Sequence, residues 1–564
     1  MRTTPPELAA RFRSRGWWGD TTVHDLFAQN AARTPQRLAV VDPPNRTDLV
    51  GGESLRLSYR ELAARAENLA GFFLRQGLTP GDVVVTQLPN IVEYVLVYLA
   101  AARLGLVVSP VPMQYRGHEL SHIVGLLAPA AYVTCAQFKD TDYARLAVGV
   151  TGGRGTRVLV FGDTDVPGAR SIDQDGAGAA AAVAACTAAQ PVAADDIYTI
   201  CWTSGTEGVP KGVPRSHNHW MAISYGHFEG ARLREGDSLL NPFPLVNMGA
   251  IGGCFMSWLR GGGTLILHHP LDLGIYLRQI AEERPDYAIA PPAILNMLLK
   301  NEALLATADL SSLRCIGSGS APLAPWMIEG YRDRFGIDVV NIFGANEGVA
   351  FISGPNEISD PALRAKYFPR FGRPEFEWPA TVSRMIETRV VDTATGEEIL
   401  EAGHPGEMQL RGPIVFDGYL GSAELTRNAF TADGYYQTGD LFQIAGEPGN
   451  ERYYEFVGRL KQLIVRGGLK ISPEELDDLL AAHPDLAEGA VVGTPDAILG
   501  ERVCAVIVPR AGKSLSVEAL RDYLESRGVA VYKWPERVVV TDALPRNPMG
   551  KVVRAELVKL ASTG

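Results

Sequence analysis

The most informative stretch of the sequence is rich in glycine and threonine and reads Thr203-Ser204-Gly205-Thr206-Glu207-Gly208-Val209-Pro210-Lys211-Gly212. It follows an apolar run, residues 197–202, that is typical of a buried strand. Glycines lack a Cβ and let backbone N–H groups approach an anion, the hydroxyls add donors, and Lys211 adds a positive charge. The combination favours polyphosphate binding, although an ordinary turn after a strand would also explain the stretch taken alone. It is not a Walker A loop, because Lys211 is followed by glycine and the glycine spacing differs.

The residues around this stretch alternate between helical and strand-like patterns. Residues 59–76 carry apolar side chains at helical spacing, and residues 93–104 show a second helical pattern. Short apolar runs predict strands at residues 82–87, 107–111 and 131–135. Helices and strands in this order predict crossover units, so we expect a large α/β N-terminal domain built from parallel-sheet subdomains.

The pattern changes after about residue 385. Short strands with Gly and Asp turns are predicted at residues 388–391, 406–410 and 453–457, which indicates a β-rich subdomain. The chain beyond residue 461 predicts a small α+β C-terminal domain, with helices at 473–482 and 517–527 and strands at 490–493, 503–508 and 537–540. The Ala-rich residues 176–189 are expected to form a surface insertion with a partial helix and no chemistry.

Three further motifs carry side chains suited to nucleotide chemistry. Phe343-Gly344-Ala345-Asn346-Glu347 ends an apolar run, which predicts a carboxylate for Mg²⁺ on ATP phosphates and a ring that can stack on a purine. Tyr436-Gln437-Thr438-Gly439-Asp440 ends on an acid that can accept hydrogen bonds from two ribose hydroxyls, with Arg459 as a further donor. Gly550-Lys551 presents a lysine on a mobile, exposed loop. Taken alone, each of these motifs is better explained by an ordinary turn, a loop or a surface side chain.

Taken in order, the four motifs resemble those of the adenylate-forming superfamily, which includes acyl-CoA synthetases, adenylation domains of peptide synthetases and beetle luciferases. Within it, the chain resembles acyl- or aryl-CoA ligases and stand-alone aryl-acid adenylating enzymes. The first motif is similar to the family's T-S-G-T-T-G-x-P-K-G, with Glu207 in place of a Thr, and the second to Y-G-x-T-E, with Asn346 in place of the Thr. Residues 436–440 are similar to Y-x-T-G-D, and Gly550-Lys551 to the terminal G-K.

The resemblance implies roles for individual residues. The phosphates would lie against Thr203, Ser204, Gly205, Thr206 and Lys211, with Glu347 and Thr206 binding Mg²⁺. The adenine would be held by Ser320, Ala321, Pro322 and Phe343 with Phe456 nearby, and the ribose by Asp440 and Arg459. Gly344 would also belong to the nucleotide site. Lys551 would lie between the substrate carboxylate and the α-phosphate. Asn346 replaces a Thr whose hydroxyl contacts that phosphate, and because an amide can also donate a hydrogen bond we expect activity to be retained.

The resemblance also implies a domain division and an acceptor loop. Residues 1–458 would form the N-terminal domain, residues 459–461 with Lys461 the hinge, and residues 462–564 a mobile C-terminal domain that carries Lys551. The loop with Gly467, Gly468 and Lys470 would face the thiol acceptor after domain rotation.

The acid-binding segment is matched by Asn247, Met248 and Gly249, with Gly319 also in the substrate pocket. Catechol-type aryl ligases carry an Asn where Met248 stands, and a thioether cannot hydrogen-bond strongly to a ring hydroxyl. Gly249 replaces a common Tyr and leaves room. We therefore expect an apolar medium-chain, alicyclic or aromatic acid, with two alternatives kept open: Asn247 reads one polar substituent, and Met248 only fills the core.

The expected activity is ATP-dependent: a carboxylate becomes an acyl-AMP with release of pyrophosphate, and the acyl group then passes to CoA. Two alternatives are transfer to a separate carrier protein and activation of an unusual substrate, for example in nitrogen–nitrogen bond formation. A non-enzymatic ATP-binding module would need neither Lys551 nor the acceptor loop, and both are present.

Composition excludes several other classes. With 46% hydrophobic and 21% charged residues the 564-residue chain is not mainly disordered, and a net charge of −11 excludes an overall basic nucleic-acid footprint. The first 20 residues contain arginines without an apolar core, so no signal peptide is expected. Glu93 and Arg103 interrupt the longest apolar stretch, so no membrane span is expected. Six cysteines without a C-x-x-C pair predict free thiols in a reducing compartment, so we expect a cytoplasmic protein. A monomer or homodimer is expected.

Overall fold

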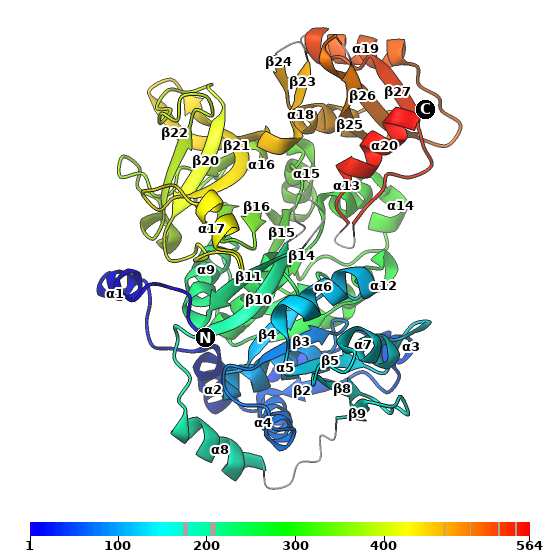
Figure 1. Ribbon diagram of the computed structural model, residues 1–564. Coiled ribbons are helices and arrows are strands. Elements are labelled where there is room, and N and C mark those ends of the chain that lie inside the picture. The colour runs from blue at the N-terminus through cyan, green and yellow to red at the C-terminus, as the bar shows by residue number, and fades with distance from the viewer. Residues whose placement is uncertain are drawn as a thin grey trace. The chain divides into compact units, whose positions relative to one another are not determined.

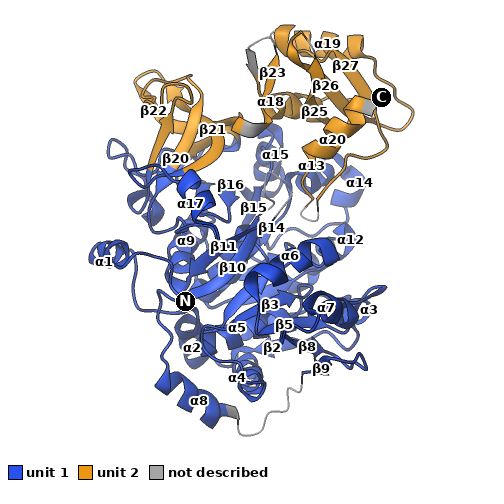
Figure 2. Cartoon of the chain, viewed as in Figure 1, with its two compact units in different colours: residues 1–365, 369–387, 410–436 blue, residues 366–368, 388–409, 437–564 orange. Residues whose placement is uncertain are grey.

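The computed structural model describes residues 1–172, 179–203, 210–466, 469–496, 498–527, 529, 531–547 and 550–563 (Figure 1). The chain divides into two compact units (Figure 2). Unit 1 comprises residues 1–365, 369–387 and 410–436, and unit 2 comprises residues 366–368, 388–409 and 437–564. Each unit is described by itself below.

An eight-stranded sheet forms the larger part of unit 1. Its strand order is β17-β16-β15-β14-β12-β13-β1-β2. Strands β1, β12, β13, β14, β15 and β16 run parallel, and the antiparallel strands β2 and β17 close its edges. The strands are β1 Leu38–Val41, β2 Arg56–Ser58, β12 Ser238–Asn241, β13 Thr264–Leu267, β14 Tyr287–Ile289, β15 Cys315–Gly319, β16 Asp338–Ala345 and β17 Val349–Ser353.

A seven-stranded sheet forms the other part of unit 1, in the order β11-β10-β4-β3-β5-β8-β9. All neighbours pair parallel except β10 and β11, which are antiparallel. The strands are β3 Val83–Gln87, β4 Val107–Pro110, β5 Ala131–Cys135, β8 Arg157–Phe161, β9 Ala169–Ser171, β10 Ile197–Thr203 and β11 Lys211–Ser216. Buried parallel strands explain why these runs are apolar throughout and do not alternate with polar residues.

Unit 1 also contains long and short helices. The long ones are α2 Val23–Arg33, α4 Tyr59–Arg75, α5 Val92–Leu104, α6 Gly117–Leu127, α7 Tyr143–Thr151, α8 Ala179–Ala189, α9 His217–Gly230, α12 Leu273–Glu283, α13 Pro292–Lys300 and α15 Pro325–Phe335. The shorter ones are α1 Pro6–Ser14, α3 Arg46–Val50, α10 Met248–Ala250, α11 Met256–Gly261, α14 Glu302–Leu305, α16 Pro361–Lys366 and α17 Ala423–Ala429; the π-turn η1 Ile251–Phe255 joins α10 to α11. Nearly every residue of α5 is buried, which is why its sequence is apolar on all faces.

A buried ion triad joins three elements of unit 1. The Arg46 guanidinium on α3 binds Asp42 at 2.8 Å and Glu93 on α5 at 2.6 Å, and Asp42 also accepts a hydrogen bond from Val92 N at 2.7 Å. Burial, together with the charge of Glu93, raises the pKa of Asp42 to about 6. Removing the cation would leave two carboxylates buried and unpaired.

We therefore expect Arg46→Met to destabilise unit 1 by about 3–5 kcal/mol, because breaking a buried ion pair from one side is costly. Arg56→Met is the matched control, since Arg56 pairs with Glu283 at the surface, where such pairs contribute about 0–1 kcal/mol. Denaturant unfolding of both variants measures the difference. Equal losses would show that the triad contributes no more than a surface pair.

Unit 2 contains two small sheets. One is five-stranded, β18-β22-β21-β20-β19, formed by β18 Tyr367–Pro369, β19 Glu387–Val391, β20 Gly406–Arg411, β21 Tyr436–Glu447 and β22 Asn450–Arg459. The other runs β24-β23-β26-β25 with β27 beside β26, and its strands are β23 Ile464–Arg466, β24 Leu469–Ile471, β25 Leu486–Asp496, β26 Gly500–Pro509 and β27 Arg537–Val540. Helices α18 Pro473–Ala481, α19 Val517–Ser526 and α20 Arg554–Thr563 accompany it. Leu476, Leu480, Leu520 and Leu524 fill one of its cores.

The predicted fold class is confirmed. The strands and helices predicted before residue 140 are β3, β4, β5, α4 and α5, within two residues at each end. The Ala-rich insertion contains α8, and the β-rich and C-terminal predictions correspond to β19–β22 and β25–β27 with α18 and α19. All six cysteines are free, five of them buried. Among the described residues, no helix is both long and apolar enough to cross a membrane. The hinge at residues 459–461 remains a prediction.

Candidate active site

The glycine-rich motif connects two antiparallel strands of unit 1. Thr203 is the last residue of β10 and Lys211 the first of β11, and the two lie opposite each other in the sheet. Ser204, Gly205 and Thr206 lie outside the described residues. The described ends of the motif therefore meet at one point at the edge of the seven-stranded sheet.

Glu347 is brought to this point from the other sheet. It follows β16 directly and is buried, and its Oε1 accepts a hydrogen bond from the Tyr419 hydroxyl at 3.0 Å. The Lys211 ammonium lies 5.1 Å from the centre of the Tyr419 ring. Burial raises the pKa of Glu347, while the Tyr419 hydroxyl and the charges of Lys211 and Arg215 oppose the rise. The first two motifs of the sequence are thus brought together around Tyr419.

Arg215, on β11, is a component of this site that the sequence analysis missed. It is fully buried and donates to the backbone oxygens of Asn346 at 2.8 Å and of Ile414 at 2.6 Å, with its guanidinium 5.0 Å from the Trp220 ring. Burial lowers its pKa to about 10, so it stays charged at neutral pH. The available signal was an arginine inside a short run, residues 212–216, that is buried throughout.

The turn after Glu347 is held against residues 414–416. Gly348 has a φ of +106°, and a Cβ there would lie 2.0 Å from Ile414 O, so only glycine permits this approach. Phe416 N donates to Glu347 O at 2.8 Å. Tyr419 follows three residues later, and its hydroxyl contacts the Glu347 carboxylate. The two residues are 72 positions apart, so no local sequence pattern predicts this contact.

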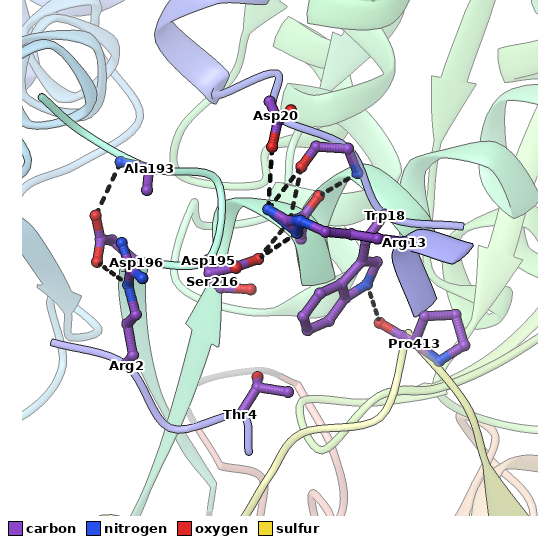
Figure 3. A network of polar contacts seen from close by, with 12 residues as sticks. Arg2, Thr4, Arg13, Trp18, Asp20, Ala193, Asp195, Asp196, Ser216 and Pro413 are labelled. Atoms are coloured by element: carbon purple, nitrogen blue, oxygen red, sulfur yellow. Dashed lines mark hydrogen bonds and ion pairs between the residues drawn. The ribbon is translucent and has the colours of Figure 1, made fainter. Parts of the chain in front are cut away.

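The N-terminal segment forms hydrogen bonds to residues 413–417. Figure 3 shows Trp18 Nε1 donating to Pro413 O at 3.2 Å and Arg13 paired with Asp195 and Asp20. The Thr3 and Thr4 hydroxyls both donate to one oxygen of Asp417, at 2.8 and 2.6 Å. These bonds fix residues 413–417, whose backbone in turn positions Arg215 and Glu347.

The donor set at this point fits Mg²⁺. Mg²⁺ is usually bound by one or two carboxylates together with substrate phosphates, and Glu347 is a buried carboxylate whose ionisation is penalised until a cation arrives. Among the residues that the structure describes, no cluster of three or more His, Cys, Asp or Glu could hold a metal by itself. The other predicted ligand, Thr206, lies outside the described residues.

The residues assigned to adenine lie on neighbouring strand ends of unit 1. Gly319 ends β15 opposite Ile342 on β16, and a Cβ on Gly319 would lie 2.0 Å from Ile342 O. The exposed Ser320, Ala321 and Pro322 follow it, and Ser320 has a φ of +73°. Phe343 and Gly344 lie on β16, half-buried and exposed. The carboxyl ends of parallel strands meet at one edge of a sheet, which is where open α/β sheets bind ligands.

The acid-pocket residues cap a short helix beside these strands. Asn247 is the N-cap of α10 and accepts from Ala250 N at 3.2 Å. Met248 points toward the glycines around it: a Cβ on Gly252 would lie 3.2 Å from its Sδ, and one on Gly344 3.8 Å from its Cγ. A Cβ on Gly249 would meet only ordinary contacts, at 3.5 and 3.6 Å.

The remaining predicted residues belong to unit 2. Asp440 is buried and pairs with Arg459 at 3.0 Å across β21 and β22, and Phe456 packs on Phe442 with ring centres 5.4 Å apart. Lys551 is exposed, in a turn closed by the bridge between Arg546 and Val552.

The pKa of Lys551 is lowered because surrounding protein displaces water, even though the side chain is accessible. The positive charge of Arg459 lowers this pKa further, and the negative charge of Asp440 raises it. The last two motifs of the sequence are thus within range of each other's charge. Gly467 and Gly468 lie outside the described residues, and the side chains of Lys461 and Lys470 are likewise not described.

Comparison with known proteins shows the family to which the chain belongs. The family model "AMP-binding enzyme" matches residues 27–420, and "AMP-binding enzyme C-terminal domain" matches residues 475–551. The chain is 32% identical to a salicylyl-CoA synthase / salicylate adenylyltransferase of Streptomyces sp., covering 98% of this chain and 96% of the relative. It is 30% identical to a medium-chain fatty-acid–CoA ligase of Escherichia coli, covering 96% and 91%. The crystal structure of ATP-bound MatB from Rhodopseudomonas palustris superposes with a TM-score of 0.76 at 28% identity, covering 96% and 99%.

The fold and the site therefore define an adenylate-forming ligase. The chain belongs to the AMP-binding enzyme family.

Proposed function

We propose that the protein is an ATP-dependent acid–thiol ligase that uses CoA as acceptor. In the first step a carboxylate oxygen of the acid attacks the α-phosphorus of ATP, the bond to the β-phosphate breaks, and pyrophosphate leaves. In the second step the sulfur of CoA attacks the acyl carbon, AMP leaves with the electron pair of the broken C–O bond, and the thiol proton passes to solvent. The free cysteines fit a reducing compartment, so we place the reaction in the cytoplasm.

The observation that carries this proposal is the buried Glu347 beside Tyr419 and Lys211. A carboxylate whose ionisation is penalised by burial and a lysine across one aromatic ring would suit a metal–polyphosphate, and both lie where the glycine-rich motif begins and ends. The MatB structure with bound ATP supports a nucleotide at the corresponding place.

Charge repulsion is the main obstacle in the first step, because a carboxylate must reach an anionic phosphate. Lys211 would hold the outer phosphates, and Lys551 would offset the charge where the carboxylate meets the α-phosphate. Mg²⁺, held by Glu347 and the phosphates, would neutralise the charge that develops on the leaving pyrophosphate. Asp440 would orient the ribose through its hydroxyls, with Arg459 already fixed beside it.

We propose an apolar acid as substrate: aromatic, alicyclic or medium-chain. Met248 lies between Gly252 and Gly344, so this part of the pocket wall is formed by a thioether and glycines. The relatives that act on salicylate and on medium-chain fatty acids support a carboxylate of this size.

A panel of acids tests this proposal. We expect acid-dependent exchange of labelled pyrophosphate into ATP with benzoate, salicylate, cyclohexanecarboxylate or octanoate, and at least about tenfold weaker exchange with 2,3-dihydroxybenzoate, because one unpaired polar group in an apolar pocket costs roughly 1–3 kcal/mol. Adding CoA should convert the acyl-AMP to a thioester that mass spectrometry detects. Exchange with 2,3-dihydroxybenzoate alone would contradict the apolar pocket.

The acceptor is tested in the same assay. If the acyl-AMP accumulates and CoA does not consume it, CoA is not the acceptor, and a carrier protein or an unusual nucleophile takes its place. A carrier protein is then the first alternative acceptor to assay. No exchange with any acid would exclude the ligase reaction for this panel.

A further inference from the structure

The side chain of Asn346 bridges two segments that belong to different parts of the candidate active site. Its Nδ2 donates to Trp202 O at 3.1 Å, and its Oδ1 accepts from Met248 N at 2.8 Å. The orientation of the amide is unambiguous, because one partner can only accept and the other can only donate. With only 9% of the residue exposed, each lost bond would leave a buried polar group unsatisfied.

The main chain of Asn346 is fixed as well. Arg215 Nη1 donates to Asn346 O, and Arg215 Nη2 donates to Ile414 O. A buried guanidinium with two backbone acceptors holds the residue rigidly, so the amide acts as a spacer of fixed length between Trp202 and Met248.

The two bridged segments have different tasks. Trp202 is followed by Thr203, where the glycine-rich motif begins. Met248 is the first residue of α10, and its side chain faces Gly252 and Gly344 in the acid pocket. Asn346 thus joins the strand that leads into the phosphate motif to the helix that carries the acid pocket.

We propose that Asn346 is a positioning residue that fixes the acid pocket relative to β10 and thereby sets affinity for the acid, more than affinity for the nucleotide. This inference rests on the proposed function for the identity of the two substrates. One N–H of the amide is already committed to Trp202 O, and the oxygen to Met248 N. The bridge therefore uses two of the four hydrogen-bonding positions of the side chain: one of its two N–H groups and one of the two lone pairs of its oxygen.

Three substitutions separate this role from a direct phosphate contact. Thr carries a single hydroxyl on Cβ and cannot reach both Trp202 O and Met248 N. Asp keeps the acceptor for Met248 N but loses the donor to Trp202 O, and Ala loses both. A residue that only contacts the α-phosphate would tolerate Thr, which still presents a hydroxyl.

The matched control is Asn341→Thr. Asn341 lies on β16, five residues before Asn346, is also buried, and donates its amide to Arg364 O and Ala365 O, outside the two bridged segments. The same substitution there removes a buried amide from the same part of the chain without touching Trp202 or Met248.

The experiment has a readout that needs no activity. Hydrogen–deuterium exchange of peptides that cover Met248 should become at least about tenfold faster at one amide in Asn346→Ala and Asn346→Thr, and stay slow in Asn346→Asp and Asn341→Thr. In kinetics with an acid from the panel, Asn346→Thr and Asn346→Asp should raise the KM of the acid about tenfold or more, while the Kd of Mg–ATP without acid changes less than about threefold.

The proposal is overturned if Asn346→Thr keeps the wild-type KM for the acid, or if the Kd of Mg–ATP rises more than the KM of the acid. If the wild type activates no acid of the panel, the proposed function fails, and the bridge is then judged by exchange alone: unchanged exchange at Met248 in Asn346→Ala overturns it. Should Asn346→Thr fail to fold, the near-isosteric Asn346→Asp decides by the same kinetic criteria.

Discussion

Lys551→Ala should slow adenylation by at least about 100-fold, which corresponds to about 3 kcal/mol of lost transition-state stabilisation. The reason is electrostatic: without the ammonium, the carboxylate and the α-phosphate approach each other with their repulsion unopposed. Thioester formation from preformed acyl-AMP should lose much less, because that step brings no second anion to the phosphate. Pyrophosphate exchange and single-turnover transfer to CoA measure the two steps separately.

The structure indicates that such a loss would be catalytic and would not arise from unfolding. Lys551 is exposed and lies in a turn that is held by other groups: Asn547 Oδ1 accepts from Lys551 N, and the Arg546 side chain donates to Gly550 O. Truncation at a surface position typically changes stability by less than about 0.5 kcal/mol. Lys513→Ala, an exposed lysine of the same unit that pairs with Asp485, is the control and should leave both steps unchanged. Equal losses in the two steps for Lys551→Ala would refute the assigned role.

The helices and strands could be predicted from the sequence where the local pattern of apolar residues matches the burial of the element. The run at residues 131–135 is apolar at each end and buried throughout, and it forms β5 with the predicted bounds. The helix at residues 59–75 begins with the capping box of Ser58 and Glu61, a local signal that needs no tertiary information.

The site was predictable only where its residues lie in contiguous motifs. Glu347 and Lys211 were found because each belongs to a recognisable run at the end of a strand: Glu347 comes just after β16, and Lys211 is the first residue of β11. Tyr419 was not found, because its link to Glu347 depends on how residues 414–419 fold back over Gly348. The bridge formed by Asn346 was also missed, since a sequence shows that an amide can donate but not which partner it meets.

Glu347→Gln should reduce the kcat/KM of adenylation for Mg–ATP by at least about 100-fold, again on the order of 3 kcal/mol. Gln can still accept the hydrogen bond from the Tyr419 hydroxyl, so the change removes charge while the neighbouring geometry stays in place. The loss should appear mainly as a higher requirement for Mg²⁺, which a magnesium titration of pyrophosphate exchange measures.

Glu347→Gln should not reduce the stability of the fold, although it reduces activity. Burial raises the pKa of Glu347, so the folded state favours its protonated form more strongly than the unfolded chain does. A carboxyl with a raised folded-state pKa costs stability once it is ionised, and this cost is absent at low pH and present above the raised pKa. Glu347→Gln removes it, so the variant should be at least as stable as the wild type at neutral pH, with an advantage that grows as the pH rises. Thermal unfolding across a pH series measures this.

Glu357→Gln is the matched control for both effects. Glu357 is another carboxylate of unit 1 whose pKa burial raises, to about 7, with the charge of Glu229 adding to the rise. The substitution should therefore also stabilise, or at least not destabilise, the fold, yet leave adenylation unchanged.

Tyr419→Phe removes only the hydrogen bond to Glu347. It should lower the kcat/KM of adenylation by up to about tenfold, about 0.5–1.5 kcal/mol, because the carboxylate keeps its charge. If Glu347→Gln retained wild-type activity and magnesium dependence, Glu347 would not be the metal ligand, because a metal ligand could not lose its negative charge without effect.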